Sequence, residues 1–96
     1  MVHGTHNAVR DQRNEEVLIS INGELFKRPE AKISVFDSGY LVGDGIWEAC
    51  RLHQGVLVFF DLHCNRLWRA AKAVHLDLKI TRKDLKKSIW KVLDAN

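Results

Sequence analysis

Residues 36–67 hold the side chains of this sequence that are best suited to bind a small anionic ligand. Glycines at positions 39, 43 and 45 come first, and Arg66 follows on a later segment. Glycine adopts backbone conformations with positive φ and lets a backbone approach a neighbour closely, so this spacing predicts a tight loop. Arg66 adds a permanent positive charge, which suits an anion.

The segment after the glycines, residues 46–51, alternates in the way that a β-strand does. Successive side chains of a strand point to opposite faces, so an aromatic residue, a small residue and an arginine share one face. Such a face suits the wall of a pocket for a small anion, although an ordinary half-buried strand has the same pattern. The two faces are Trp47, Ala49, Arg51 and His53 on one side, and Ile46, Glu48, Cys50 and Leu52 on the other.

Two motifs in this region resemble the class IV, or fold type IV, pyridoxal-phosphate aminotransferases. The first is the D-x-G-Y-x-x-G-D-G-[IV]-aromatic-E run at residues 37–48, and the second is the H-x-x-R-L-x-x-[AS]-A run at residues 63–71. Their order and the apolar hairpin between them make the resemblance specific, and it extends over roughly residues 17–93. The family includes branched-chain, D-amino-acid and (R)-amine transaminases and aminodeoxychorismate lyase.

The resemblance implies that Arg66 binds the phosphate of pyridoxal 5′-phosphate, because it matches the family's phosphate-binding arginine. A planar guanidinium with several fixed donors suits phosphate oxygens. The helical projection places Arg66 at the edge of the buried side, with its stem against the core and its head free to reach sideways. The alternative to a phosphate ligand is an ordinary surface arginine at the edge of a helix.

The resemblance also implies the substrate-binding residues. Trp47, Ala49 and Arg51 match the strand positions that line the family's substrate pocket, and Tyr40 and Val42 match a loop that reaches the neighbouring subunit's pocket. The alternative to a substrate-binding role is that Trp47 is an ordinary core residue. Ala49 stands where many members have glycine, so the implied pocket is narrower by one methyl group.

In the resembled family a C-terminal domain supplies the lysine that forms the Schiff base with the cofactor, and no lysine of this sequence matches it. We therefore expect residues 17–96 to be the N-terminal domain of such an enzyme, with the catalytic C-terminal domain absent from this chain. No catalytic residue is then assigned here. The chain alone is expected to be inactive and to bind the cofactor weakly or not at all.

The elements that position these residues predict an α+β domain, because strands come as a block and helices follow. Residues 17–21, the turn Asn22-Gly23 and residues 24–26 predict a β-hairpin with a type I′ turn. Residues 32–35 predict a brief strand, and the apolar run 56–60 predicts a strand covered on both faces. We expect one antiparallel sheet from about residue 17 to residue 60.

Two helices, near residues 61–75 and 82–94, are expected to pack on this sheet. Asp61 is the predicted N-cap of the first helix, and Thr81 with Asp84 has capping-box spacing before the second. Lysines fall mostly on one side of the second helix. The first helix is expected to bury the side formed by Phe60, His63, Leu67, Ala70, Ala71 and Val74.

Residues 1–16 are polar and lack apolar periodicity, so we expect a flexible N-terminal arm. His3 and His6 stand three residues apart, but no third ligand is near, which favours an exposed tail over a metal site. No metal site is predicted elsewhere.

Composition places the chain among globular proteins, with 46% hydrophobic and 28% charged residues. Cys50 and Cys64 lack metal-ligand spacing and sit in apolar patterns, which favours two reduced, buried thiols. No stretch reaches the ~18–20 apolar residues of a membrane span, and the N-terminus has no signal-peptide core. We expect a soluble, cytoplasmic protein without a membrane partner.

Three functional hypotheses follow. The first is the N-terminal part of an aminotransferase that moves an amino group between a branched-chain or D-amino acid and a 2-oxo acid, in a homo-oligomer. The second is a protein-interaction or dimerisation module of the same ancestry. The third, a nucleic-acid-binding domain, rests on the net charge of +3 and the lysines of the last helix, for which a solvated helix face is the better explanation.

Overall fold

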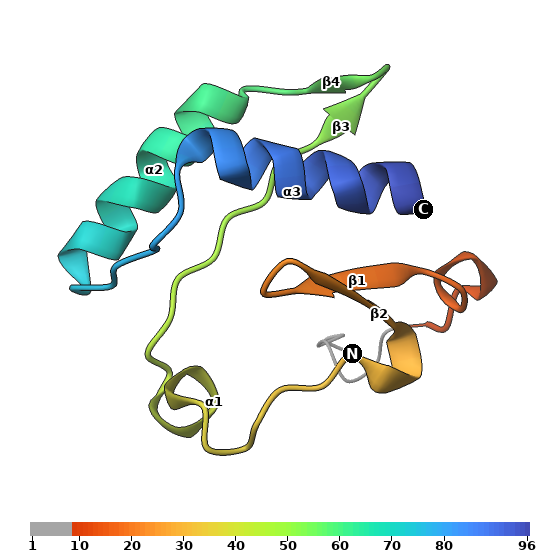
Figure 1. Ribbon diagram of the computed structural model, residues 1–96, viewed down its shortest axis with the longest axis horizontal. Coiled ribbons are helices and arrows are strands. Elements are labelled where there is room, and N and C mark those ends of the chain that lie inside the picture. The colour runs from red at the N-terminus through yellow and green to blue at the C-terminus, as the bar shows by residue number, and fades with distance from the viewer. Residues whose placement is uncertain (1–8) are drawn as a thin grey trace, which may run out of the picture. The chain divides into compact units, whose positions relative to one another are not determined.

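A computed structural model describes residues 9–96, and Figure 1 shows its elements in chain order. The chain divides into two compact units, one of Met1–Lys32 with Lys86–Asn96 and one of Ile33–Leu85. Helices and small antiparallel sheets occur together in the described residues, which is compatible with the α+β class.

The N-terminal arm predicted for residues 1–16 is described only from residue 9, so His3 and His6 lie outside the described residues. A short 3-10 helix, η2, spans Gln12–Asn14. The Asp11 carboxylate caps it by accepting a hydrogen bond of 2.9 Å from the Arg13 backbone N–H. This single turn is therefore held by local side-chain contacts.

The first hairpin is the one that the sequence predicts. Strands β1, Leu18–Ile21, and β2, Glu24–Lys27, pair antiparallel. Asn22 and Gly23 link them with φ values of 53° and 83°. Positive φ at both central positions defines the type I′ turn, which confirms the prediction.

The C-terminal end of the last helix belongs to the same unit as this hairpin. The Asn96 amide accepts from the Leu18 N–H at 2.7 Å and donates to the Leu18 carbonyl at 3.0 Å. The Lys91 ammonium donates to the Gly23 carbonyl at 3.1 Å. These contacts satisfy backbone groups of an edge strand and of the turn, which would otherwise need water.

Replacing Gly23 with alanine is expected to destabilise the hairpin by about 1 kcal/mol, because an L-residue at φ 83° is strained. A Cβ at this position would meet no atom within 4 Å, so the cost is purely conformational. Gly45→Ala is the matched control, since its Cβ also meets open space but no positive φ is required there. Urea denaturation followed by circular dichroism measures both, and equal effects would contradict this explanation.

The single sheet predicted for residues 17–60 is wrong, because the described residues form two separate two-stranded sheets. The second sheet pairs β3, Leu52–His53, with β4, Val56–Leu57. Pro29 lies in a second 3-10 helix, η3, at Arg28–Glu30.

The strands predicted at 32–35 and 46–51 do not form, and the strand predicted at 56–60 is cut to two residues. A strand requires a neighbour whose backbone groups can pair with its own. Within the part of the chain that the structure describes, 32–35 and 46–51 have no such neighbour.

The glycine-rich segment contains a short helix in place of the predicted simple loop. Helix α1 spans Ser38–Val42, and the Asp37 carboxylate caps it by accepting from the Gly39 N–H at 2.8 Å. Gly43 ends it in the left-handed conformation, at φ 70°. The glycine at position 43 is thus used for chain reversal, as the positive-φ argument anticipates.

Helix α2 spans Phe60–Ala73, close to the predicted 61–75. Its N-cap is Phe59, which has φ 53°, so the prediction of Asp61 as N-cap is wrong and Asp61 lies in the first turn. There its carboxylate faces the positive end of the helix dipole. Cys64 and Ala71 are buried, whereas Val74, predicted to face the core, is 42% exposed.

Helix α3 spans Arg82–Ala95, as the pattern at 82–94 predicts. The capping box forms: the Asp84 N–H donates to the Thr81 hydroxyl at 3.1 Å, and the Thr81 N–H donates to the Asp84 carboxylate at 3.4 Å. Among residues 9–96, no helix is long and apolar enough to cross a membrane. The lysines Lys83, Lys86, Lys87 and Lys91 are exposed, whereas Leu85, Ile89, Val92 and Leu93 are half-buried.

Candidate anion-binding site

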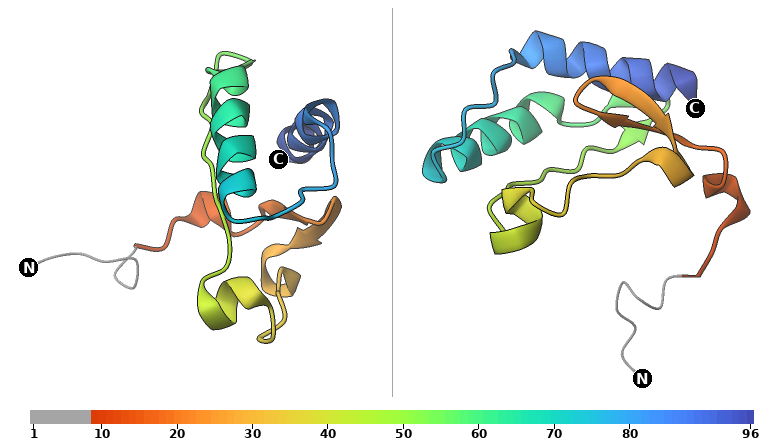
Figure 2. Two further views of the ribbon diagram at one scale, coloured as in Figure 1. Left: turned by 90° about the vertical axis from the view of Figure 1, so that its left-hand side faces the viewer. Right: turned by 60° about the horizontal axis from the view of Figure 1, so that its bottom comes forward.

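The site lies in the unit formed by Ile33–Leu85, where residues 46–51 run in an extended conformation beside α2 (Figure 2). Burial alternates along this segment, as the sequence predicts for its two faces. Trp47, 84% exposed, lies with Ala49 and Arg51 on the open side, while Glu48 and Cys50 are half-buried. The alternation is therefore correct although the strand is absent, because an extended backbone alone suffices to produce it.

A pocket of about 450 Å³ brings several of the predicted residues together. Trp47, Ala49 and Arg66 all line it, with Glu48 and Ala70 between them. Two segments build this pocket, since Trp47, Glu48 and Ala49 come from the extended segment and Arg66 and Ala70 come from α2. The remaining predicted substrate residues, Arg51, Tyr40 and Val42, are not among its lining residues.

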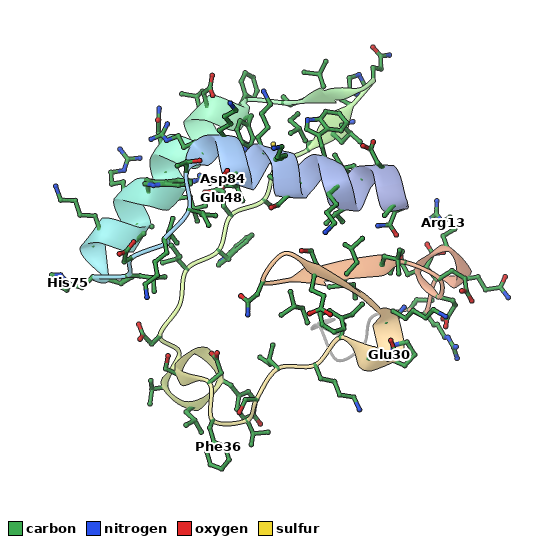
Figure 3. The ribbon with its side chains drawn as sticks, viewed as in Figure 1. Arg13, Glu30, Phe36, Glu48, His75 and Asp84 are labelled. Carbon is green, nitrogen blue, oxygen red and sulfur yellow. The ribbon has the colours of Figure 1, made fainter. Side chains whose placement is uncertain are left out.

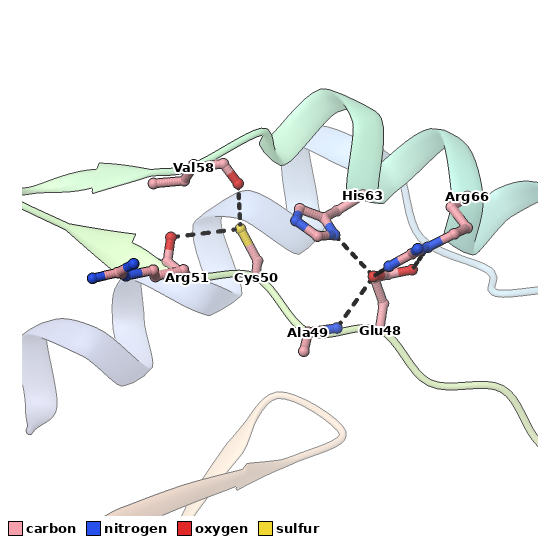
Figure 4. A network of polar contacts seen from close by, with 7 residues as sticks. All are labelled: Glu48, Ala49, Cys50, Arg51, Val58, His63 and Arg66. Atoms are coloured by element: carbon pink, nitrogen blue, oxygen red, sulfur yellow. Dashed lines mark hydrogen bonds and ion pairs between the residues drawn. The ribbon is translucent and has the colours of Figure 1, made fainter.

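Glu48, one of the residues that line this pocket, is the centre of a polar network (Figure 4). Arg66 donates from Nε to Glu48 Oε2 at 2.7 Å and from Nη2 to Glu48 Oε1. Nδ1 of His63 lies 2.8 Å from Glu48 Oε1. An ionised carboxylate only accepts hydrogen bonds, so the Nδ1 atom of His63 must carry the proton of this bond.

The three side chains differ strongly in exposure. Glu48 is 11% exposed, His63 25% and Arg66 64%. The carboxylate therefore lies inside and the guanidinium outside. The hydrogen bonds from Arg66 and then from His63 lower the pKa of the Glu48 carboxyl to about 2, and the same pairing raises the pKa of Arg66.

This pKa shift makes stability depend on pH. A carboxyl whose pKa is lower in the folded chain than in the unfolded chain stabilises the fold at neutral pH. That stabilisation is expected to fade as the pH falls from about 4.5 towards about 2. Urea denaturation of wild type and Glu48→Gln across this range is the measurement.

The difference between wild type and Glu48→Gln should be largest near neutral pH and vanish near pH 2. Glu24→Gln, at an exposed position of β2, controls for the loss of one negative charge. A difference that stays constant across the range would show that Glu48 stabilises the fold by packing and not by its charge.

The Arg66 head group, predicted to be free to reach sideways, is paired with the Glu48 carboxylate. The guanidinium has five N–H groups, and Glu48 engages two of them, so three remain. These three suit a phosphate group at the exposed side of Arg66. Arg66 therefore fits a phosphate ligand, to which it would offer one charged contact.

The pocket lacks a partner for the reactive aldehyde end of pyridoxal phosphate, which requires a lysine. None of its lining residues is a lysine. Lys72 and Lys79 line a different pocket, of about 440 Å³, between the end of α2 and the start of α3. Within the described residues no cluster of three or more His, Cys, Asp or Glu side chains can hold a metal ion.

A second pocket, of about 280 Å³, lies on the inner side of the same extended segment. Cys50 and Cys64 both line it, and neither is part of a disulfide. Cys64 is 2% exposed, as expected of a buried thiol, while Cys50 is half-buried and donates to the Val58 carbonyl at 3.3 Å.

Sequence reasoning missed the roles of Glu48 and His63. It placed Glu48 on the face of its segment opposite Trp47, and His63 and Arg66 on the same helix. Residues three apart on a helix lie side by side, so a carboxylate that faced this helix would meet both. The spacing of His63 and Arg66 on one helix, together with the face assigned to Glu48, was therefore the sequence feature that could have predicted this network.

No protein-family model matches this sequence. Several curated proteins do, over about four-fifths of the chain. A D-alanine aminotransferase of Bacillus licheniformis is 33% identical over 78 residues, which are 81% of this chain and 28% of the relative. The D-alanine aminotransferase of Staphylococcus haemolyticus is 38% identical over 78 residues, with the same two shares.

A plant protein matches as well. The branched-chain-amino-acid aminotransferase-like protein 1 of Arabidopsis thaliana is 35% identical over 83 residues, 86% of this chain and 15% of the relative. The chain is thus a relative of the class IV aminotransferases, the D-alanine and branched-chain enzymes among them. It spans between 15% and 28% of the length of these relatives.

Proposed function

We propose that this chain forms one wall of the active site of a pyridoxal-phosphate-dependent class IV aminotransferase. The observation that carries the proposal is the pocket in which Trp47, Ala49 and Arg66 meet, because Trp47 belongs to the first family motif, Ala49 follows it directly and Arg66 belongs to the second. In this proposal Arg66 holds the cofactor phosphate. Trp47 and Ala49 bound the space for the substrate side chain.

The cofactor, when bound, supplies the electron sink for amino transfer, and the protein supplies binding and orientation. Because no lysine lines the pocket, the lysine that anchors the cofactor would come from sequence beyond residues 1–96. We propose that residues 17–96 act as the N-terminal domain of the enzyme. Its substrates would be a branched-chain or D-amino acid and a 2-oxo acid.

An amino-transfer assay tests this proposal. A polypeptide in which this chain continues into its downstream reading frame should transfer an amino group from D-alanine or leucine to a 2-oxo acid when pyridoxal phosphate is present. Residues 1–96 alone should show neither transfer nor a Schiff-base absorbance. Amino transfer by the 96-residue chain itself would contradict the proposal that the cofactor-anchoring lysine lies outside this chain.

A second candidate function, a dimerisation or interaction module, is favoured by the apolar side chains that stand in solvent. Phe36 is 81% exposed and points away from the chain (Figure 3). Apolar patches beyond a few hundred Å² seldom stay bare. In the segment 33–47 the exposed large apolar residues are Ile33, Val35, Phe36, Tyr40, Leu41, Val42 and Trp47.

We therefore expect the chain to self-associate. Light scattering at rising concentration should give a mass above that of one chain, and Phe36→Glu should lower it, because a charge disfavours apolar contact. Val9→Glu, at a residue that is 92% exposed in the other unit, is the control. A wild-type monomer at high concentration would count against self-association.

A further inference from the structure

We infer that Glu48 is the positioning residue of the anion site: its carboxylate fixes the Arg66 guanidinium so that the outer N–H groups face the incoming phosphate. This inference rests on the proposed function and goes beyond it, because it assigns a role to a residue that does not touch the ligand. A guanidinium that donates from both Nε and Nη2 to one carboxylate is fixed in its plane as well as in its position.

The support of Glu48 itself is firm. Its carboxylate also accepts a hydrogen bond of 2.8 Å from His63 Nδ1, and its side chain is only 11% exposed. His63 and Arg66 are one turn apart on α2, a regular helix from residue 60 to residue 73. The position of the guanidinium is therefore fixed both by α2, which carries Arg66, and by the extended segment, which carries Glu48.

The charge of Glu48 also acts against an anion, so two effects compete. Glu48 lies behind Arg66, and Arg66 is 64% exposed, so an anion that binds the outer N–H groups is separated from the carboxylate by the guanidinium. Water and salt screen repulsion at such an exposed position. Because Glu48 already holds the long Arg66 side chain in place, Arg66 loses little rotamer freedom when the anion binds. We take this gain to be larger than the screened repulsion between Glu48 and the anion.

The hydrogen bond between Glu48 and Arg66 should be visible by NMR in the Nε–H group of Arg66. In the 96-residue chain, the Arg66 Nε–H should give a slowly exchanging NMR correlation, because it is bonded to Glu48 at 2.7 Å. Arg66→Lys identifies the peak by removing it. In Glu48→Gln the peak should exchange at least several-fold faster, whereas a peak unchanged by this substitution overturns the inference.

Inorganic phosphate is the probe for the binding step, with its affinity measured by NMR titration of the same chain. Glu48→Gln and Glu48→Asp should both weaken phosphate binding by about fivefold, because neither keeps the two-point contact at full reach. Glu48→Asp retains the negative charge, so it also covers the case in which Glu48→Gln fails to fold. Binding that tightens or stays equal in a folded Glu48 variant overturns the inference.

Arg66→Ala separates this inference from the proposed function. If Arg66→Ala leaves phosphate affinity unchanged, the phosphate role of Arg66 fails, and the positioning role fails with it. If Arg66→Ala weakens binding while both Glu48 variants bind like wild type, the inference alone fails. In the Arg66→Ala background, Glu48→Gln should have no further effect on affinity, as expected of a residue that acts through Arg66.

Discussion

In the proposed aminotransferase, Arg66→Ala is expected to lower the affinity for pyridoxal phosphate by roughly ten- to a hundredfold, or about 1.5–3 kcal/mol. The substitution would remove the proposed charge-assisted hydrogen bond to the phosphate. It also leaves the Glu48 carboxylate without its main partner. Titration of the cofactor into the apoprotein of the longer polypeptide measures the loss.

Two further variants sharpen this measurement. Arg66→Lys should recover only part of the affinity, because a point charge cannot reproduce the forked geometry of a guanidinium. Arg69→Ala is the matched control, since Arg69 lies one turn further along α2, is exposed and does not line the 450 Å³ pocket. An equal loss in Arg66→Ala and Arg69→Ala would point to general electrostatic attraction and not to a defined phosphate contact.

Cys64→Asp is expected to unfold the unit that contains α2 at neutral pH. Cys64 is 2% exposed, the most deeply buried side chain of the described residues. An uncompensated charge in such a place costs about 3–5 kcal/mol. A chain of this size has a total stability of only about 5–15 kcal/mol, so the loss approaches the whole.

Urea denaturation of Cys64→Asp should give a midpoint far below that of wild type, and lowering the pH to about 4 should restore part of it, because a protonated carboxyl is cheaper to bury. Leu62→Asp is the control, since Leu62 is 64% exposed in the first turn of α2, where a negative charge is favourable. A wild-type midpoint for Cys64→Asp would mean that this core is open to water.

The elements that sequence predicted best are those held by local interactions. Asn22-Gly23 specifies its own turn, and the Thr81–Asp84 capping box fixes the start of α3 within four residues. The predicted strands at 32–35 and 46–51 failed because a ladder depends on a partner that no local pattern reveals.

The start of α2 shows a second limit. Asp61 has the right chemistry for an N-cap, yet the helix begins after Phe59, whose left-handed backbone no propensity would suggest. The chain turns sharply between β4 and α2, and the residue at that position takes the conformation that the turn needs. Tertiary placement, and not residue type, decides this boundary.

The candidate site was predicted as a set of residues but not as a network. The alternation argument found the shared face of Trp47 and Ala49, and the motif resemblance added Arg66. The bond between Glu48 and Arg66 joins two segments 18 residues apart in sequence. Which of two partners a long arginine side chain chooses depends on the distance across that gap, which the sequence does not contain.

A crystal structure of the assembled protein with pyridoxal phosphate would test the central claim most directly. We predict that phosphate oxygens lie about 2.7–2.9 Å from N–H groups of Arg66, the range of charge-assisted hydrogen bonds. The Glu48 carboxylate should still hold Nε of the same guanidinium from behind. A cofactor whose phosphate is bound elsewhere, with Arg66 directed only at Glu48, would contradict both the assigned site and the role of this chain in it.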